Sequence, residues 1–302
     1  KKDMENIGNA LTNLSLFDFQ KKFTSDNDCL KHLSSIKWDT GFECKKCKHT
    51  HNCKGVKEFD RQCCKCNYVE SPMAGTLFHK IKFPLLNAFY MVYFISTNKK
   101  GITSTELARK LGMKQKVCWL FKRKVMIAMD SSGNFPLSGV VEVDETFVGG
   151  ADENSKGRKK GKKKLVVIAI EKKKKGVSRF YAKVIDKADA LNLGSFMEQK
   201  ITKDASITTD EWTGYKPLDK VFPNMKHIKS GKKGENFPEM HRVIMNFKGW
   251  LRGMHHYVGD LQDYINEYTY RFNRSFMKGN IFDNLLERMI KTKPHTYKTI
   301  IN

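Results

Sequence analysis

Three side chains with oxygen atoms, widely separated along the chain, lie where they could bind divalent cations. Asp144 lies in the alternating segment VVEVDETFVGG, Asp210 ends the segment SITTD, and Asn246 lies in the helical segment FPEMHRVIMNFKGWLRGMHH. Mg²⁺ and Mn²⁺ prefer carboxylate and amide oxygens. Two such ions can activate an attacking oxygen and stabilise a leaving oxygen at phosphorus. These three residues therefore form a candidate magnesium site for phosphodiester chemistry.

Ordinary structural roles remain open for the same residues. A single aspartate on a strand is most often a surface residue, and a helical asparagine can hydrogen-bond at a helix interface. Glu145 and Glu211 lie beside the two aspartates and are competing carboxylates.

The helical periodicity around Asn246 separates its neighbours into faces. With 3.6 residues per turn, Glu239 and Asn246 share one face of the helix, whereas His241 and Lys248 point elsewhere. Glu239 lies two turns before Asn246, about 10 Å along the axis, so it is a poor substitute for the asparagine.

Four cysteines in two CxxC pairs have the spacing of a structural zinc site. Fifteen residues separate the two pairs. Zinc takes four soft ligands in a tetrahedron, and each CxxC turn can supply two of them. The alternative, a redox-active dithiol, normally needs one CxxC at the start of a helix. The predicted ligands are Cys44, Cys47, Cys63 and Cys66, although Cys53, Cys64, His49 and His51 lie nearby and leave the register open.

The charge of the chain favours a polyanionic partner. There are 56 Lys and Arg residues against 32 Asp and Glu, which gives a net charge of +24. An excess of this size is self-repulsive unless a polyanion relieves it, and DNA or RNA is the first candidate. A merely lysine-rich surface and an anionic membrane are the alternatives. No run reaches the ~18 apolar residues of a membrane span, so we expect no membrane insertion and an intracellular protein, in the nucleoid or cytoplasm of a bacterium or in a nucleus.

The segment 101–128 has the pattern of a helix-turn-helix. A short helix closed by Gly112 precedes a second helix from about Lys114 to Ala128. Apolar residues of both helices could face inward, and basic residues of the second could contact DNA phosphates and base edges. An ordinary helical hairpin with a solvated basic face is the alternative. The basic residues are Lys114, Lys116, Lys122, Arg123 and Lys124.

Alternating strand and helix patterns after residue 139 predict an α/β domain. We expect strands at 140–148, 165–170, 179–184 and 206–209, and helices at 188–200, 238–252 and 261–272. The linker SSGNFPLSG precedes them. The predicted domains are an N-terminal helical lead (1–35), a zinc ribbon (36–72), a helix-turn-helix region (73–135) and a catalytic domain (136–302).

Several long motifs together point to one family. They are FECKKC, QCCKC, AGTLFHK, STNKKGITSTELARKLG, VEVDETFVGG, TDEWTGY, HRVIMNFKGWLRGMHH and YINEYTYRFNRS. With these motifs, residues from about 20 to 275 resemble the insertion-sequence transposases that carry an N-terminal zinc ribbon, the ISXO-like group, to which eukaryotic Merlin transposases are distantly related.

The resemblance implies a ribonuclease-H-like core with an acidic triad whose third member is Asn in this subgroup. It places the triad on Asp144, Asp210 and Asn246, with Asp144 bridging two Mg²⁺ (or Mn²⁺) ions, and a following basic residue on Lys248 or Arg252. Contacts to DNA phosphates are expected from Lys159, Lys160, Lys248, Arg252, Arg271 and Arg274.

The function implied is cut-and-paste DNA transposition. The zinc ribbon and helix-turn-helix would bind the terminal inverted repeats of double-stranded DNA, and at least a dimer would handle two transposon ends and the target. Two alternatives are a catalytically silent DNA-binding protein derived from such an element, and a zinc-ribbon transcription factor with an unrelated α/β domain.

Overall fold

The structure, a computed structural model, describes residues 14–131, 133–149, 163–254, 260–275, 277 and 280–301. The chain divides into two compact units. Unit 1 comprises Lys1–Met129 with Phe276–Asn302, and unit 2 is Asp130–Ser275. Among the described residues, no helix combines the length and the apolar character needed to cross a bilayer.

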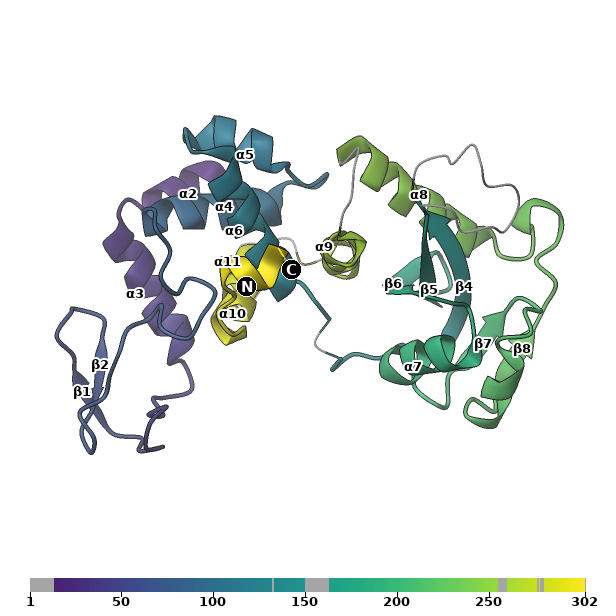
Figure 1. The fold of residues 1–302 in the computed structure, drawn as a ribbon, viewed down its shortest axis with the longest axis horizontal. Coiled ribbons are helices and arrows are strands. Elements are labelled where there is room, and N and C mark those ends of the chain that lie inside the picture. Colours follow the sequence, from purple (N-terminus) through teal and green to yellow (C-terminus); the bar gives the residue numbers. More distant parts are fainter. Residues whose placement is uncertain are drawn as a thin grey trace, which may run out of the picture. The chain divides into compact units, whose positions relative to one another are not determined.

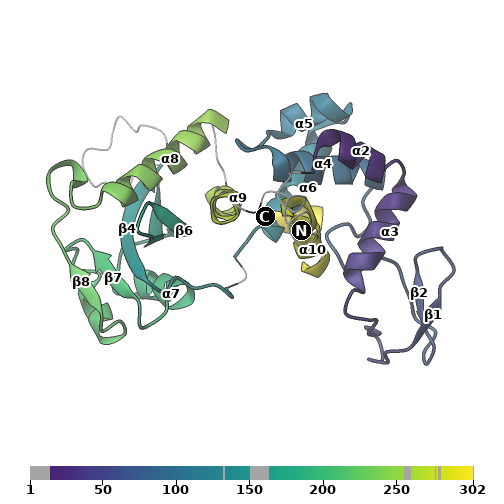
Figure 2. The ribbon, with the colours of Figure 1, turned by 180° about the vertical axis from the view of Figure 1, so that it is seen from behind.

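Unit 1 joins a small antiparallel sheet to a group of helices (Figures 1 and 2). Local signals set the helix ends: Ser25 and Asp28 form a capping box at the start of one helix, and Gly112 closes another in the left-handed conformation. The strands are β1 (Asn52–Lys54), β2 (Arg61–Cys63) and β3 (Val69–Glu70), and the helices are α2 (Leu16–Lys22), α3 (Asp26–Lys37), α4 (Leu85–Thr97), α5 (Ser104–Leu111), α6 (Gln115–Ala128), α10 (Ile281–Lys291) and α11 (Tyr297–Ile301).

Helix α10, which follows unit 2 in sequence, belongs to the core of unit 1. Phe282 is buried, and its ring centroid lies 5.6 Å from that of Phe19 and 6.0 Å from that of Phe89. Arg288 Nε donates a 2.7 Å hydrogen bond to the carbonyl of Ala128 at the end of α6. Helix α10, which lies within the segment 136–302 expected to form the catalytic domain, therefore packs with the N-terminal helices.

Unit 2 is built on a five-stranded mixed sheet. The strands are β4 (Val140–Val148), β5 (Lys164–Lys172), β6 (Val177–Ile185), β7 (Ser206–Thr209) and β8 (Met225–His227), in the order β6-β5-β4-β7-β8. The first three strands form an antiparallel meander, and β7 and β8 run parallel to β4. This mixed α/β arrangement agrees with the ribonuclease-H-like core that the resemblance implies.

Helices cover both faces of this sheet (Figure 1). Helix α7 (Ala190–Lys200) packs against one face, in a core that includes Val141 and Val143 of β4. Helices α8 (Pro238–Met254) and α9 (Leu261–Asn273) pack against the other face. Two short 3-10 turns, η1 (Lys216–Lys220) and η2 (Lys232–Gly234), lie between β7 and α8 in sequence.

Side chains of α9 cover the exposed edge of β6. Asn273 accepts a 2.8 Å hydrogen bond from the N–H of Phe180 and donates a 3.0 Å bond to its carbonyl. Gln262 accepts a 2.9 Å bond from the N–H of Val184. Because an edge strand otherwise presents unpaired backbone groups, these bonds fix α9 to the sheet and protect that edge.

Candidate active site and cysteine cluster

Asp144 lies on the face of β4 that is covered by α8. Side chains alternate along a strand, and Val141 and Val143 point into the core on the α7 side. Glu142, Asp144 and Thr146 therefore point to the α8 side. Asp144 lies in the middle of a nine-residue strand that pairs with β5 along its whole length, so its position is rigid.

The surroundings of Asp144 disfavour its ionised form. Burial raises the pKa of this carboxyl to about 6, and the negative charge of Asp210 acts in the same direction. A hydrogen bond from the N–H of Glu145 and the charges of His241 and Lys248 oppose the rise in pKa. A buried carboxylate whose pKa is raised by a second carboxylate nearby is typical of a metal site.

Asp210 follows directly after β7 and is held by its own loop. Its Oδ1 accepts a 3.0 Å hydrogen bond from the N–H of Trp212, and the indole of Trp212 is anchored by a 2.7 Å bond to the carbonyl of Ala188. Trp212 is therefore a packing residue that orients the aspartate, as its type suggested.

His241 and Lys248 lie on one face of α8, and Asn246 lies on another. The charges of His241 and Lys248 act on Asp144, and these two residues point within about 20° of each other on a helix with 3.6 residues per turn. Asn246 points about 140° away from His241 on the same helix, and it is exposed. Asn246 therefore lies on a different face of α8 from the two residues whose charges act on Asp144.

The imidazole of His241 is enclosed on one side by η2. Its Nε2 is buried and has no hydrogen-bond partner among the described residues. A Cβ atom added to Gly234, which has a φ of +74°, would lie 1.8 Å from Nε2. Only glycine therefore fits at position 234 while His241 keeps this orientation. Neither residue stood out as a site residue in the sequence.

Lys248 is attached to the strand that carries Asp144. Its Nζ donates a 2.7 Å hydrogen bond to Oγ1 of Thr146. Burial lowers the pKa of Lys248, Lys163 lowers it further, and the charge of Asp144 opposes both effects. Arg252, the other candidate for the basic position, is exposed one turn later on α8.

The competing carboxylates lie elsewhere. Glu145 is on the α7 face of β4, where it accepts a 2.8 Å hydrogen bond from the buried hydroxyl of Tyr215. Burial raises the pKa of Tyr215 well above its usual value, and the charge of Glu145 adds to that rise. Glu211 is exposed, and Glu239 is ion-paired with Arg242 on the flank of α8 that also carries Asn246.

The possible ligand atoms of the candidate site are not close together. Among the described residues, only one group brings three or more Cys, His or acidic ligand atoms within 4.8 Å of one another, and that group consists of cysteines. The ligand atoms of Asp144, Asp210 and His241 therefore lie farther apart than those of a closed metal site.

The cysteine cluster has the geometry of a tetrahedral zinc site. The Sγ atoms of Cys44 and Cys66 lie 3.6 Å apart, and those of Cys47 and Cys63 lie 3.5 Å apart. With Zn–S bonds of 2.3 Å, sulfur atoms at the corners of a tetrahedron are about 3.8 Å apart. These four residues could hold zinc, and they are the four that the spacing predicted. Cys64, by contrast, is exposed and outside the group.

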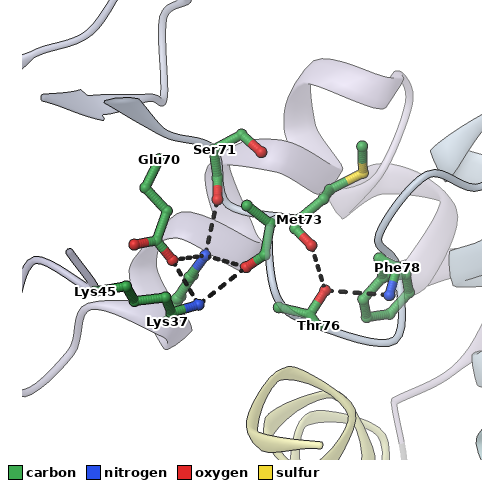
Figure 3. A network of polar contacts seen from close by, with 8 residues as sticks. Lys37, Lys45, Glu70, Ser71, Met73, Thr76 and Phe78 are labelled. Atoms are coloured by element: carbon green, nitrogen blue, oxygen red, sulfur yellow. Dashed lines mark hydrogen bonds and ion pairs between the residues drawn. The ribbon is translucent and has the colours of Figure 1, made fainter. Parts of the chain in front are cut away.

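A buried ion-pair network joins the cysteine cluster to α3 (Figure 3). Oε1 of Glu70 lies 2.7 Å from Nζ of Lys37, the last residue of α3, and 2.7 Å from Nζ of Lys45, within the first CxxC. Lys37 also donates to the carbonyls of Ser71 and Ala74, at 2.8 and 2.7 Å. The cluster and the helical part of unit 1 are therefore firmly connected.

The predicted helix-turn-helix is present as α5 and α6, but its basic residues differ in exposure. Lys114 and Lys116 are exposed. Lys122 is buried and donates a 2.8 Å hydrogen bond to the carbonyl of Ile102, and Arg123 is also buried beside the ring of Trp119. Lys124 is half-buried. Lys122 and Arg123 thus stabilise the hairpin instead of forming part of a free basic face.

The other residues predicted to contact DNA phosphates also differ in exposure and in their partners. Arg271 forms a 2.7 Å ion pair with the buried Glu267 and is itself only 11% exposed. The guanidinium of Arg274 lies 4.3 Å from the ring centroid of Tyr270. Lys159 and Lys160, with most of the basic tract 156–164, lie outside the described residues.

Comparison with known families identifies unit 2. Residues 136–273, nearly the whole unit, match the family described as the ISXO2-like transposase domain. Unit 2 is an ISXO2-like transposase domain. This DDE-type family implies polynucleotidyl transferase chemistry, and its match ends at Asn273, just before the segment that returns to unit 1.

Among solved structures, the chain matches complexes of the Mos1 transposase at low similarity. A pre-cleavage Mos1 transpososome has 10% identity over 65% of this chain and 76% of that chain, with a TM-score of 0.28. The Mos1 strand transfer complex has 9% identity over 69% and 78%, with a TM-score of 0.29. TM-scores this far below 0.5 do not establish a shared fold. No curated protein matches the chain.

Proposed function

We propose that the protein is a DNA transposase that cleaves transposon ends and joins them to target DNA. The observation that carries this proposal is the pair of carboxylates in the transposase domain. Asp144 lies on β4 and Asp210 follows the neighbouring strand β7. The negative charge of Asp210 contributes to the raised pKa of Asp144.

The residues around these carboxylates fit a divalent cation. A cation would relieve the repulsion between Asp144 and Asp210, and the buried Nε2 of His241 has no described partner. We therefore assign metal binding to Asp144, Asp210 and His241, which must move closer together than they lie here to share an ion. Mg²⁺ or Mn²⁺ bound there would activate the attacking oxygen and stabilise the leaving oxygen at phosphorus.

Lys248 supplies the fixed positive charge at this site. Its hydrogen bond to Thr146 holds the ammonium group beside Asp144, where it can bind a phosphate oxygen of the DNA strand. Partial burial strengthens this attraction, because charges interact more strongly where water is excluded.

The modules of unit 1 would bind the DNA ends. We assign a structural zinc ion to Cys44, Cys47, Cys63 and Cys66, and phosphate contacts to Lys114 and Lys116 of the α5–α6 hairpin. The net charge of +24 supports a polyanionic partner. Transposition joins two ends, so we propose that at least two subunits act together.

A cleavage assay on DNA from the flanks of the coding sequence tests the proposal. The wild type should shift this duplex in a gel and nick it only with Mg²⁺ or Mn²⁺. Asp210→Ala should shift the duplex equally and not nick it. If neither protein nicks the duplex and both bind it, the chain is a catalytically silent DNA-binding protein.

A further inference from the structure

The two carboxylates of the candidate site differ in how their strands support them. Asp144 lies inside a nine-residue strand, whereas Asp210 follows a strand of only four residues. On its outer side β7 pairs only with β8, a three-residue edge strand, through Ile207, Thr208 and Thr209. The position of Asp210 therefore depends on additional contacts at the end of β7.

A chain of side-chain hydrogen bonds supplies these contacts. Thr209 pairs with His227 across the two strands, and its buried Oγ1 lies 2.8 Å from Nδ1 of His227. The same Oγ1 donates a 2.9 Å hydrogen bond to the carbonyl of Asp210. Nε2 of His227 lies 2.9 Å from Oδ1 of Asp219, which comes from η1.

We infer that the chain Asp219–His227–Thr209 is a positioning device for Asp210. It crosses from η1 through the edge strand to the main chain of the metal-binding residue. Thr209 fixes the carbonyl of Asp210, while the N–H of Trp212 fixes Oδ1 of its side chain. The two bonds together determine both the place and the direction of the carboxylate. This inference rests on the proposed function, since it assigns Asp210 as a metal ligand.

The hydrogen-bond donors and acceptors in the series Asp219–His227–Thr209 can be assigned. The carboxylate of Asp219 can only accept, so Nε2 of His227 carries a hydrogen. Since the Thr209 hydroxyl donates to the carbonyl of Asp210, its lone pairs are left to accept from Nδ1. His227 thus connects the carboxylate of Asp219 to the hydroxyl of Thr209 through its two ring nitrogens.

The arrangement resembles a Thr–His–Asp catalytic triad only in composition. Thr209 is fully buried, so its hydroxyl cannot reach a substrate. Its hydroxyl bonds the carbonyl of Asp210 and the imidazole of His227. A positioning role is therefore the one that this geometry supports.

Binding of Mn²⁺ to the full-length, zinc-loaded protein tests the inference without depending on cleavage. Residues behind the direct ligands typically change metal affinity by about 10- to 100-fold when they are removed. We expect Thr209→Val to weaken Mn²⁺ binding by about 10-fold or more. Thr209→Ser, which keeps the hydroxyl, should restore affinity close to the wild type. Asp219→Asn should weaken binding in the same direction, and as a half-exposed site it should not disturb folding.

Asn224→Ala is the matched control. Asn224 donates a 3.1 Å hydrogen bond to the carbonyl of Asp204 beside the other end of β7, so its loss perturbs the same strand pair away from Asp210. The control should bind Mn²⁺ like the wild type. Equal losses in Asn224→Ala and Thr209→Val would overturn the inference, because the effect would then belong to the sheet edge in general.

A further variant separates the inference from the proposed function. If Asp210→Ala binds Mn²⁺ as tightly as the wild type, the metal site itself is assigned wrongly. If Asp210→Ala loses affinity while Thr209→Val and Asp219→Asn keep it, the site is right and the positioning device is wrong. In cleavage assays, Thr209→Val and Asp219→Asn should raise the Mg²⁺ concentration needed for half-maximal rate. Their effect on the rate at saturating Mg²⁺ should be smaller.

Discussion

Lys248 and Thr146 connect α8 to β4 through a 2.7 Å hydrogen bond from Nζ to Oγ1, two residues beyond Asp144 on the same face of the strand. Replacing Lys248 by Ala removes a positive charge that favours the ionised form of Asp144. We expect cleavage to slow by about 100-fold, because the positive charge proposed to bind a phosphate oxygen is lost. Thr146→Val, which removes only the acceptor, should have a smaller effect. Equal effects of the two variants would show that the charge of Lys248 is unimportant.

His241 and Asn246 provide a direct test of which face of α8 belongs to the site. His241→Ala should reduce cleavage by at least about 100-fold, because it removes a group at the reaction centre. Asn246→Ala should stay within a few-fold of the wild type, since Asn246 is exposed on another face. Gly234→Ala should reduce cleavage less than His241→Ala does, because its methyl group displaces the imidazole without removing it. Nicking rates on a common duplex substrate measure all three. The opposite ranking of the first two would restore the asparagine as the third ligand.

Asp144 should destabilise the metal-free protein at neutral pH. Its pKa in the folded state is about 6, above the ordinary 3.8. A carboxyl with a raised pKa favours folding at pH values below the ordinary pKa, and that contribution is lost as the pH rises through about 6. Asp144→Asn should therefore raise the free energy of unfolding at pH 7.5 by on the order of 2–3 kcal/mol.

Denaturant unfolding at several pH values checks this sign. The advantage of Asp144→Asn should shrink as the pH falls from 7 to 4, and Mg²⁺ should stabilise the wild type more than the variant. A variant that is less stable than the wild type at pH 7.5 would contradict the environment described for Asp144.

Zinc binding should require Cys63 but not its neighbour Cys64. Cys63→Ser removes one of four buried or half-buried ligands, and small modules of this kind rarely fold without the metal. We expect its zinc content to fall from one ion per chain and its binding to DNA ends to be lost. Cys64→Ser should keep both, because Cys64 is exposed. Elemental analysis and gel shifts measure the two effects.

Glu70 should be a strong determinant of the stability of unit 1. Glu70→Gln leaves the ammonium groups of Lys37 and Lys45 close together without their shared counter-charge. Loss of one partner from a buried ion pair costs about 3–5 kcal/mol. Glu43→Gln breaks the exposed pair with Lys48 and should leave the unfolding midpoint unchanged. Similar midpoints for the two variants would mean that the Glu70 network has little energetic weight.

The sequence predicted the elements with strong local signals. The strand at 140–148 and the strand at 206–209 occur with those bounds, and the four cysteines of the cluster are those that the CxxC spacing predicted. The three-residue strand β8 was missed because it is too short to show periodicity. Helix α10 was missed as a partner of the N-terminal helices, because only tertiary packing of Phe282 reveals where it belongs.

The sequence left open which face of α8 packs against the sheet. Periodicity grouped Asn246 with Glu239 and separated both from His241, and that grouping is correct. What the sequence lacks is the direction of the sheet relative to the helix. Burial of Val243, Ile244 and Phe247 fixes that direction. The burial of Lys122 on α6 also could not be predicted from the sequence. Its position suggested a basic stripe, but the side chain is buried and bonds the carbonyl of Ile102.

The path of the chain makes the transposase domain an insertion within the helical unit. A fragment that stops at Ser275 would lack α10, and the N–H of Leu77 would lose its acceptor, the carbonyl of Met289. Such a truncation would damage the half of the protein that it was meant to preserve. Producing the helical half alone requires residues from both sides of the transposase domain, whereas the transposase domain can be excised as one continuous piece.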